Sequence, residues 1–542
     1  MTRSRTPESG EQDSLIHRVI GTETEYGVIA PADAGANHTV LSAQVVTAYA
    51  RVHPEHHPVG WDYTDEAPLS DARGWEVSRE DAHPSQLTDV VPVLDARQVA
   101  RSAPGSYSGW DEEAIYRENY SEEADSMVMN LVTANGARLY VDHAHPEYSA
   151  PETRDPLAAL RYDLAGDVAV RQSMAYLAGQ PELPDIQLYR NNTDGRVSYG
   201  SHENYLVPRA VPFRALAAGL TPFFVTRQVF AGAGRLGIGP KNEPGFQLSQ
   251  RADFFETEIG LETTIRRPII NTRDEPHSDS EKYRRLHVII GDANQSHTAG
   301  WLKLGTTAAV LSVIEAGAAP DIEVYEPVAA LQTVSHDVRF RASLRLIDGR
   351  RVSALDIQEM YLDAASRLVD ARDSEALRLL EAWGGIVDRL RTDPFGTADT
   401  LDWSAKHALM QRYRDQRGLA WDDPTLRLVD LQYADIREDR SIYHKLIAAG
   451  RMRTLLDAET IRHAASEPPA DTRAYFRGRL ISQFPRHVLG ASWDSAVVNN
   501  PRTRRVQRID LREPLRGTKA LTADLFDRHQ DFGAFLEDLL KH

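Results

Sequence analysis

The chain has 542 residues, of which 42% are hydrophobic and 26% charged, so it has the composition of a globular protein and ample length for a large core. Its formal net charge of -17 argues against general nucleic-acid binding, because neutralising phosphates requires a basic surface. The absence of cysteine excludes disulfides, thiolate metal sites and cysteine nucleophiles. No apolar run approaches the ~20 residues of a membrane-spanning helix and the start of the chain is polar, so we expect a cytoplasmic protein with no membrane contact.

The polar residues 1–16 predict a disordered tail, and residues 17–30 then alternate like a β-strand. This alternation places Glu23 and Glu25 on one face of the strand. Two carboxylates arranged in this way repel each other unless a cation lies between them, and a solvent-facing edge strand is the alternative explanation. A short helix is predicted at residues 42–52.

Residues 52–126 are irregular and rich in Asp, Glu, Pro, Ser and Gly, with scattered aromatic residues. A loop of this length inside a compact domain is normally either functional or disordered. We therefore predict an insertion that overhangs a functional site.

The densest polar cluster follows this insertion. Asn135-Gly136 is a hairpin signal between two predicted strands, residues 127–133 and 136–141. Successive side chains of a strand point to opposite faces, so the second strand has an apolar face and a polar face. A solvated sheet face is the ordinary explanation, but similar clusters recur along the chain and favour a site. The polar face carries Arg138, Tyr140 and Asp142, and His143, His145 and Glu147 follow it.

The next segments supply further candidates. A helix is predicted at residues 156–179 and a short strand at 186–189, and an extended segment then places His202 and Asn204 on one face, where a buried, satisfied histidine is the usual explanation. Residues 232–237 fit the glycine pattern of dinucleotide-binding folds. The prolines that follow prevent a helix there, so we predict a glycine loop and no Rossmann site.

Residues 251–290 form the most basic region of this acidic chain. The planar guanidinium group suits phosphate and stays charged, so Arg251 and Arg273 are candidate phosphate ligands, with surface ion pairs as the alternative. His287 enters a strand that is otherwise apolar. Core-packing helices are predicted at 301–316, 355–369 and 375–390, and a small terminal unit at 472–542 contains Trp493, a core residue or a platform for a base.

Together these clusters are what a magnesium–nucleotide site on an antiparallel sheet requires, because carboxylates hold hard cations and arginines hold phosphates. Imidazole is an unusual magnesium ligand, which favours a site of the glutamine synthetase type over a simple hydrolytic one. The residues alone therefore predict an ATP-using carboxylate–amine ligase or amidohydrolase, without a named substrate.

Several longer motifs follow one another along the chain: Gly21-Thr-Glu-Thr-Glu-Tyr-Gly27, Asn135 to Tyr148, Asn191 to Asp194, Ser201 to Tyr205, Arg267 to Pro276 and Glu281 to His287. These motifs resemble the family of Pup ligases and Pup deamidases/depupylases, where Pup is the prokaryotic ubiquitin-like protein. The resemblance runs from about Arg18 to the C-terminus. It implies an α+β fold, with a large glutamine synthetase-like domain at 17–471, whose curved, mainly antiparallel sheet is packed by helices, and a small C-terminal domain at 472–542.

Within this family, Asp142 to Glu152 and the long insertion before it are similar to the branch that deamidates Pup's C-terminal glutamine and removes Pup from conjugates. The ligase branch has almost no loop there. We therefore predict a deamidase and depupylase with Pup and pupylated proteins as partners. The alternatives are the sibling Pup ligase, a γ-glutamyl ligase for small molecules, and a nucleotide-bound protein that only sequesters Pup.

The resemblance also implies residue roles. Asp142 is the expected catalytic carboxylate, either attacking the γ-carbonyl of Pup's last residue to form a transient anhydride or activating water as a general base. ATP or ADP is the expected bound cofactor, not consumed at each turnover, and His143 and His145 are expected to be supporting residues. Mg²⁺ is assigned to Glu23, Glu25, Tyr140, Glu147, His202 and His287, and the nucleotide to Arg138, Arg251, Arg273 and Trp493.

Overall fold

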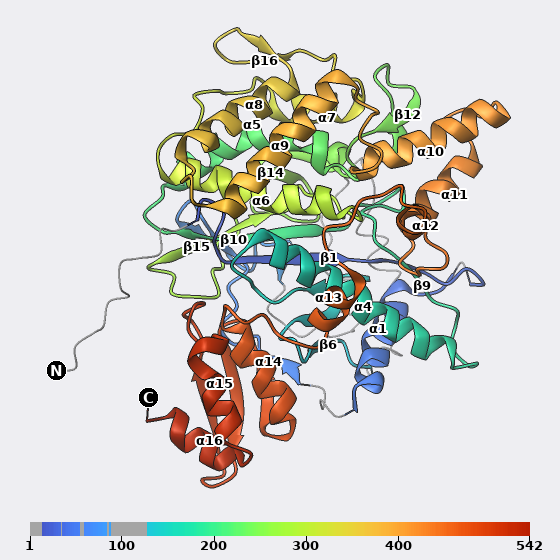
Figure 1. Ribbon diagram of the computed structural model, residues 1–542. Helices are drawn as coiled ribbons and strands as arrows, with labels where there is room; N and C mark the ends of the chain where they lie inside the picture. Colours follow the sequence, from blue (N-terminus) through green and yellow to red (C-terminus); the bar gives the residue numbers. More distant parts are fainter. Residues whose placement is uncertain (1–13, 34, 55–58, 84–85, 88–126, 542) are drawn as a thin grey trace.

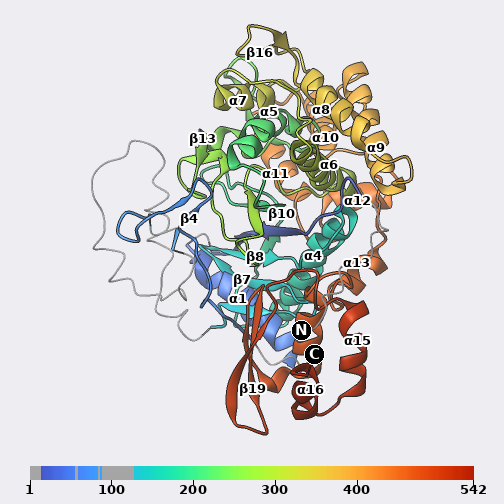
Figure 2. The ribbon, with the colours of Figure 1, turned by 90° about the vertical axis from the view of Figure 1, so that its left-hand side faces the viewer.

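The computed structural model describes residues 14–33, 35–54, 59–83, 86–87 and 127–541 (Figure 1). A mainly antiparallel sheet crosses the middle of the molecule, helices cover it, and a small unit formed by the end of the chain lies at one side (Figures 1 and 2). The predicted α+β architecture is confirmed. Among the described residues no helix is both long and apolar enough to cross a membrane.

The central sheet is the scaffold of the candidate site. In the described part of the chain it has six strands in the order β15-β10-β1-β8-β7-β6, and each neighbouring pair is antiparallel. The Asn-Gly hairpin is confirmed: Gly136 has a φ of 82° and joins β6 to β7. The strands are β1 (Ile20–Glu25), β6 (Asn130–Val132), β7 (Arg138–Asp142), β8 (His145–Ser149), β10 (Ser201–Pro208) and β15 (Tyr283–Val288).

The register of these strands brings distant polar residues together. Glu23 lies opposite His202, and Glu147 lies opposite both Glu25 and Tyr140. Because side chains alternate between faces, the residues between these positions point to the other side of the sheet, where Leu139 is fully buried in the core. The period-2 pattern of the sequence therefore sets which side chains face the site.

Helices cover the apolar face of the sheet. Helix α4 (Pro156–Ala178) begins where the Asp155 carboxylate accepts hydrogen bonds from two backbone amides and Pro156 occupies the first turn. Helices α5 (Phe213–Ala231) and α6 (His297–Glu315) are almost entirely buried. The predicted helices at 156–179, 301–316, 355–369 and 375–390 are confirmed within a few residues as α4, α6, α8 (Ala354–Leu368) and α9 (Ser374–Thr392).

The remaining elements flank this core. The helices are α1 (His38–Val52), α7 (Pro327–His336), α10 (Asp402–Arg417), α11 (Pro424–Tyr433), α12 (Ile442–Ala448) and α13 (Ala458–Ala464). The short strands are β2 (Gly27–Ile29), β4 (Ser70–Asp71), β5 (Trp75–Glu76), β9 (Gln187–Tyr189), β11 (Arg235–Ile238), β12 (Pro244–Gln247), β13 (Phe255–Gly260), β14 (Arg267–Asn271), β16 (Leu344–Arg345) and β17 (Arg351–Val352).

The small C-terminal unit has its own hydrophobic core, in which Phe476, Phe526 and Phe535 pack together. Its sheet is completed by β3 (Gly60–Trp61), which pairs in parallel with β18. The boundary at residue 472 stays a prediction, but a strand from the early chain belongs to this sheet. The other elements are α14 (Ala474–Gln483), β18 (Val488–Ala491), β19 (Ser495–Asn500), β20 (Arg505–Asp510), α15 (Lys519–Arg528) and α16 (Phe532–Leu539).

Two predictions concern segments that fall partly outside the described residues. Of the predicted tail, residues 14–16 are in contact with the large domain: the Ser14 hydroxyl donates to Asp373, and Ile16 is buried. The predicted disorder therefore does not extend to these residues. Residues 88–126, the longest part of the predicted insertion, lie outside the described residues.

Candidate functional site

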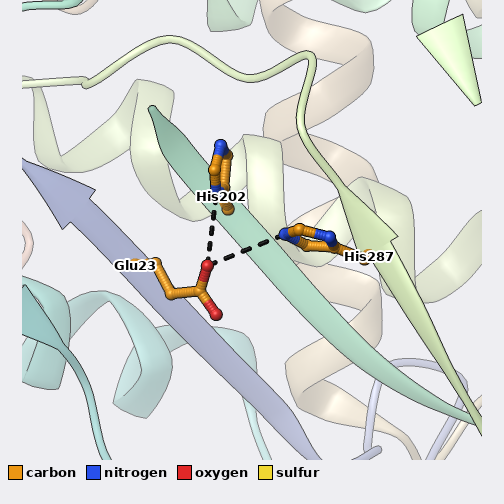
Figure 3. A group of neighbouring side chains, drawn as sticks. All are labelled: Glu23, His202 and His287. Atoms are coloured by element: carbon orange, nitrogen blue, oxygen red, sulfur yellow. Dashed lines mark hydrogen bonds and ion pairs between the residues drawn. The ribbon is translucent and has the colours of Figure 1, made fainter. Parts of the chain in front are cut away.

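Three side chains from adjacent strands of the sheet form the first group (Figure 3). The Glu23 carboxylate on β1 lies 3.1 Å from Nδ1 of His202 on β10 and 3.7 Å from Nε2 of His287 on β15. Burial lowers the pKa of His287 to about 3, so its imidazole is neutral and carries a free lone pair. Neither of its ring nitrogens has a hydrogen-bond partner among the described residues, which fits a metal ligand.

Three carboxylates form the second group. One oxygen each of Glu25, Asp142 and Glu147 lies within 4.8 Å of the others, and Glu25 also accepts a hydrogen bond from the Gly200 amide at 2.6 Å. Burial raises the pKa of Glu147 well above its ordinary value, and the carboxylates of Asp142, Glu23 and Glu25 raise it further. A hydrogen bond with Tyr140 opposes this rise. Carboxylates this close favour a bound cation, and an all-oxygen set suits a hard ion such as Mg²⁺.

The two groups face each other across Gly200. A Cβ atom at this glycine would lie 2.4 Å from Nε2 of His202 and 2.5 Å from Oε1 of Glu25, so a side chain there would occupy the space between the groups. The residues therefore fit one or more cations held between two ligand sets. This geometry brings together Glu23, Glu25, Glu147, His202 and His287, with Tyr140 beside Glu147.

Asp142 is held as a carboxylate at this site. Burial opposes its ionisation, but the charge of His143 and a hydrogen bond of 2.8 Å between His143 Nδ1 and the carboxylate lower the pKa of Asp142 below its ordinary value. His143 lies between strands β7 and β8 and has a φ of 52°, in the left-handed region. An ionised carboxylate suits both a nucleophile and a general base.

Arg273 adds positive charge beside these carboxylates. Its side chain is buried, its Nε has no hydrogen-bond partner among the described residues, and burial lowers its pKa. The charges of Glu275, Glu23 and Asp142 act in the opposite direction, so the guanidinium lies within the field of both acidic groups. A buried guanidinium with an unmatched donor suits an anionic ligand.

Arg138 lies among aromatic rings, next to Tyr140. Its guanidinium carbon is 3.8 Å from the centre of the Tyr140 ring and 4.3 Å from that of Trp61. The Trp61 ring in turn meets Trp493 of the small domain edge-on, with centroids 5.0 Å apart. A row of side chains, Trp493, Trp61, Arg138 and Tyr140, therefore leads from the small domain to the carboxylates, with the Arg138 cation between two rings.

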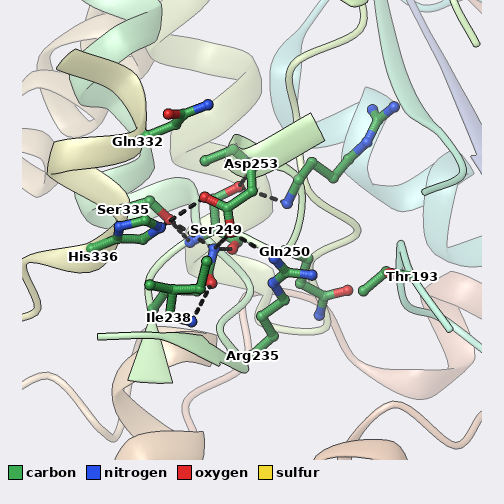
Figure 4. Close-up of polar contacts among 12 residues, drawn as sticks. Thr193, Arg235, Ile238, Ser249, Gln250, Asp253, Gln332, Ser335 and His336 are labelled. Carbon is green, nitrogen blue, oxygen red and sulfur yellow. Dashed lines mark hydrogen bonds and ion pairs between the residues drawn. The ribbon is translucent and has the colours of Figure 1, made fainter. Parts of the chain in front are cut away.

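Arg251 is placed differently from the other predicted nucleotide ligands. It is 1% exposed, and its guanidinium donates to the Ser198 hydroxyl and to the backbone carbonyls of Ile289 and Gly291. Figure 4 shows the polar cluster next to this segment, where Asp253 accepts from Arg235 on β11 and meets His336 of α7 at 2.7 Å each. These contacts give Arg251 a structural role, and its contact with a nucleotide stays a prediction.

Arg285 and Glu66 were not singled out from the sequence, and Asn204 was placed on the face of His202 without a role. Asn204 donates to Glu23 at 2.9 Å, and Arg285 lies 3.4 Å from the Glu275 carboxylate. Burial raises the pKa of Glu66 to about 7, and Trp61 donates its indole N–H to this carboxyl group. Asn204 and Arg285 lie within the quoted motifs and Glu66 in the irregular segment, but only the strand register and the fold of that segment show that they meet the site.

Comparison with known proteins identifies the family. A family model described as Pup-ligase protein matches residues 18–497. The chain belongs to this family. It is 49% identical over 522 residues to a depupylase of Acidothermus cellulolyticus, covering 95% of this chain and 97% of the relative. It is 46% identical to the Pup deamidase/depupylase of Mycolicibacterium smegmatis, covering 94% and 97%.

Ligases of the same family match a shorter part of the chain. A Pup–protein ligase of Rhodococcus erythropolis is 42% identical over 363 residues, which cover 65% of this chain and 80% of the ligase. Among solved structures, the complex of Pup with its ligase PafA has a TM-score of 0.73 and 28% identity, and covers 97% of this chain and 95% of the solved one. The ligase PafA with ADP has a TM-score of 0.67 and 32% identity, covering 83% and 99%. The glutamine synthetase-like fold expected from the sequence is confirmed.

Proposed function

We propose that this protein is a Pup deamidase and depupylase, which releases ammonia from glutamine-ended Pup and cleaves the isopeptide bond between Pup and a target lysine. The observation that carries this proposal is the 46–49% identity to proteins named depupylase or Pup deamidase/depupylase, over 94–95% of this chain. The ligase match covers only 65% of it. The proposed partners are Pup and pupylated proteins, and the cytoplasmic location stays a prediction.

Both reactions have the same electrophile, the γ-carbonyl of Pup's last residue. We propose Asp142 as the catalytic group, because it is half-buried and ionised and lies in one group with Glu25 and Glu147. In one route its carboxylate attacks the carbonyl, the carbon–nitrogen bond breaks, the amine leaves with a proton, and water hydrolyses the resulting anhydride. In the other route Asp142 takes a proton from the attacking water. His143 orients the carboxylate in either case.

We further propose that Mg²⁺ and ATP or ADP bind between the two acidic groups. One structural relative, the Pup ligase PafA, was solved in complex with ADP, which supports a nucleotide in this fold. Two sets of side chains would hold the metal. The first set is Glu23, His202 and His287, and the second is Glu25, Glu147 and Tyr140. A metal ion bound there would supply positive charge that stabilises negative charge developing on the carbonyl oxygen. Arg138 and Arg273 would contact phosphates, and Trp493 would lie at the nucleotide's edge.

One assay tests the proposal and separates it from its nearest rival. The protein is incubated with Mg-ATP and a Pup-conjugated protein, and in parallel with glutamine-ended Pup. Free target and released ammonia are the expected products. Glutamate-ended Pup with a lysine-bearing target and ATP is expected to yield no conjugate. Conjugate formation without cleavage would identify a ligase, and no product in any arm would favour a protein that only sequesters Pup.

A further inference from the structure

Arg477 of α14 links the small domain to the segments next to β7 and β8, the strands that carry Asp142 and Glu147. Its side chain is fully buried. Its Nε donates to the Gly136 carbonyl in the β6–β7 turn at 2.9 Å, and its remaining nitrogens donate to the Glu152 carboxylate just after β8. It also donates to the Trp493 carbonyl at 2.9 Å and lies 5.0 Å from the centre of the Trp493 ring. The Arg477 guanidinium thus fixes the turn before β7 and the segment after β8 relative to Trp493.

A second arginine offers a built-in comparison. Arg473, one turn earlier in α14, donates to the same Glu152 carboxylate at 2.7 Å. Its other contact is the Leu511 carbonyl at 2.8 Å, within the small domain. Both arginines are buried and both neutralise Glu152, whose pKa they lower to about 2 against the effect of burial. Among the described residues, Arg477 contacts Trp493 and Gly136, whereas Arg473 contacts neither.

The backbones of α14 and of the β6–β7 turn lie so close together that neither segment has room to shift. A Cβ on Gly136 would lie 3.0 Å from the Ala474 carbonyl oxygen, and one on Gly478 would lie 2.6 Å from the Ala134 carbonyl oxygen. Gly136 also has a positive φ, which favours glycine. Helix α14 therefore packs directly on the turn that leads into β7, and Figure 1 shows α14 next to β6. A shift of Arg477 would move this turn and Trp493 together.

We propose that Arg477 is a positioning residue for the nucleotide. It holds the Trp493 ring against Trp61 and thereby sets the row that continues through Arg138 to Tyr140. This inference rests on the proposed function, in which Trp493 and Arg138 lie against the nucleotide. The planar fork of arginine is required, because four acceptors in three different segments surround it and a lysine ammonium cannot reach them with the same geometry.

The test compares Arg477→Lys with the matched control Arg473→Lys in the full-length protein. Depupylation is measured as a function of ATP concentration. Arg477→Lys is expected to raise the ATP concentration for half-maximal rate about tenfold, the effect of losing about one charge-assisted hydrogen bond. The rate at saturating ATP is expected to stay within about twofold, because the contacts of Asp142 itself are unchanged. Arg473→Lys is expected to change the half-maximal concentration less than about threefold.

A double-mutant cycle then asks whether Arg477 acts through Trp493. In a Trp493→Phe background, Arg477→Lys is expected to have less than half its effect on the ATP requirement, on a logarithmic scale, whereas Arg473→Lys keeps its own small effect. Equal effects of the two lysine variants, or additive effects in the cycle, would overturn the positioning role. If the wild type shows no ATP requirement at all, the proposed function fails instead.

A second pair of variants covers the case in which Arg477→Lys does not fold. Glu152→Gln combined with Arg477→Gln leaves one buried guanidinium, that of Arg473, and the control, Glu152→Gln with Arg473→Gln, leaves one as well, that of Arg477, so the two variants carry the same buried charge. A raised ATP requirement in the first variant alone is expected. The same requirement in both would overturn the inference.

Discussion

Asp142 lies among several charged side chains, and its neighbours have opposite effects on the pKa of its carboxyl group. Burial and the nearby carboxylates Glu25 and Glu147 oppose a second or third negative charge, while His143 supports ionisation of Asp142. The pKa values of the two carboxyl groups therefore differ: that of Asp142 falls, so it stays ionised, and that of Glu147 rises. Such a separation is typical of sites in which one acid acts chemically and the others hold a cation.

We expect Asp142→Asn to fold, to bind ATP with unchanged affinity and to lose both deamidation and depupylation by about 10³-fold or more. The amide keeps the size of the side chain but neither attacks a carbonyl nor accepts a proton. Release of ammonia from glutamine-ended Pup and cleavage of a Pup conjugate measure the two activities. Retained isopeptide cleavage would remove Asp142 from the mechanism.

Glu152 makes a prediction about acid stability. Its pKa is about 2 in the folded protein, below the ~4.3 expected in an unfolded chain, because Arg477 and Arg473 outweigh the cost of burial. A lowered folded-state pKa adds stability above about pH 4.3, which is lost as pH falls toward about 2. The wild type should therefore exceed Glu152→Gln in free energy of unfolding by on the order of 3 kcal/mol at pH 7. Urea unfolding should show this difference shrinking between about pH 5 and pH 3, and a difference independent of pH would contradict it.

At the scale of elements, the site depends on the register of four strands. Glu23 on β1, Glu147 on β8, His202 on β10 and His287 on β15 meet because neighbouring antiparallel strands align these positions and the side-chain period is two. A slip of one residue in any pair would turn one ligand to the helix-covered face. The sheet itself therefore holds the proposed metal ligands in position.

A substitution at Gly200 tests whether the arrangement of the proposed metal ligands matters, because it removes none of them. Its replacement by alanine would place a methyl group within 2.5 Å of both Glu25 and His202, so these side chains must move apart. We expect Gly200→Ala to weaken Mn²⁺ binding, used as a paramagnetic substitute for Mg²⁺, at least about tenfold in electron paramagnetic resonance titrations, corresponding to about 1.4 kcal/mol. Gly385→Ala on α9 is the control, since a Cβ there meets no atom within 4 Å. Equal affinity in the two variants would argue against a cation between the groups.

Elements with a clear period were predictable, and those defined by tertiary contacts were not. The Asn-Gly turn and the alternation of β7 predicted its polar face, because both signals are local. Helix α5 was missed, since fifteen of its nineteen residues are buried, which removes the one-sided pattern, and Pro222 lies inside it. Arg477 gave no local signal either, because its partners lie more than three hundred positions away at Gly136 and Glu152.

At the scale of the whole molecule, the small domain is not a separate unit in sequence. Val59, Trp61 and Val132 belong to its hydrophobic core, and β3 completes its sheet. Its interface with the large domain also includes the buried ion pairs of Glu152 with Arg473 and Arg477. Domain boundaries read from composition alone miss such exchanges, because strand pairing between distant segments leaves no local pattern.

An isolated fragment of residues 472–542 is therefore expected not to fold cooperatively. It lacks Trp61 and β3, one of the two strands that pair with β18, and the buried Arg473 and Arg477 would lose Glu152. Circular dichroism during heating should show no sharp transition, and amide NMR signals should be poorly dispersed. The full-length chain is the control. A sharp transition in the fragment would show that β3 is dispensable for this domain.

The parallel pairing of β3 with β18 also bears on how the chain is made. Residues 60 and 61 leave the ribosome long before residues 490 and 491, the positions with which they pair. Until translation is nearly complete, Trp61 has no partner strand and its neighbourhood exposes apolar surface. The contact between Trp61 and Trp493 therefore forms only after residue 493 has been synthesised, so we expect a chain that ends before β18 to lack the proposed nucleotide contact of Trp493.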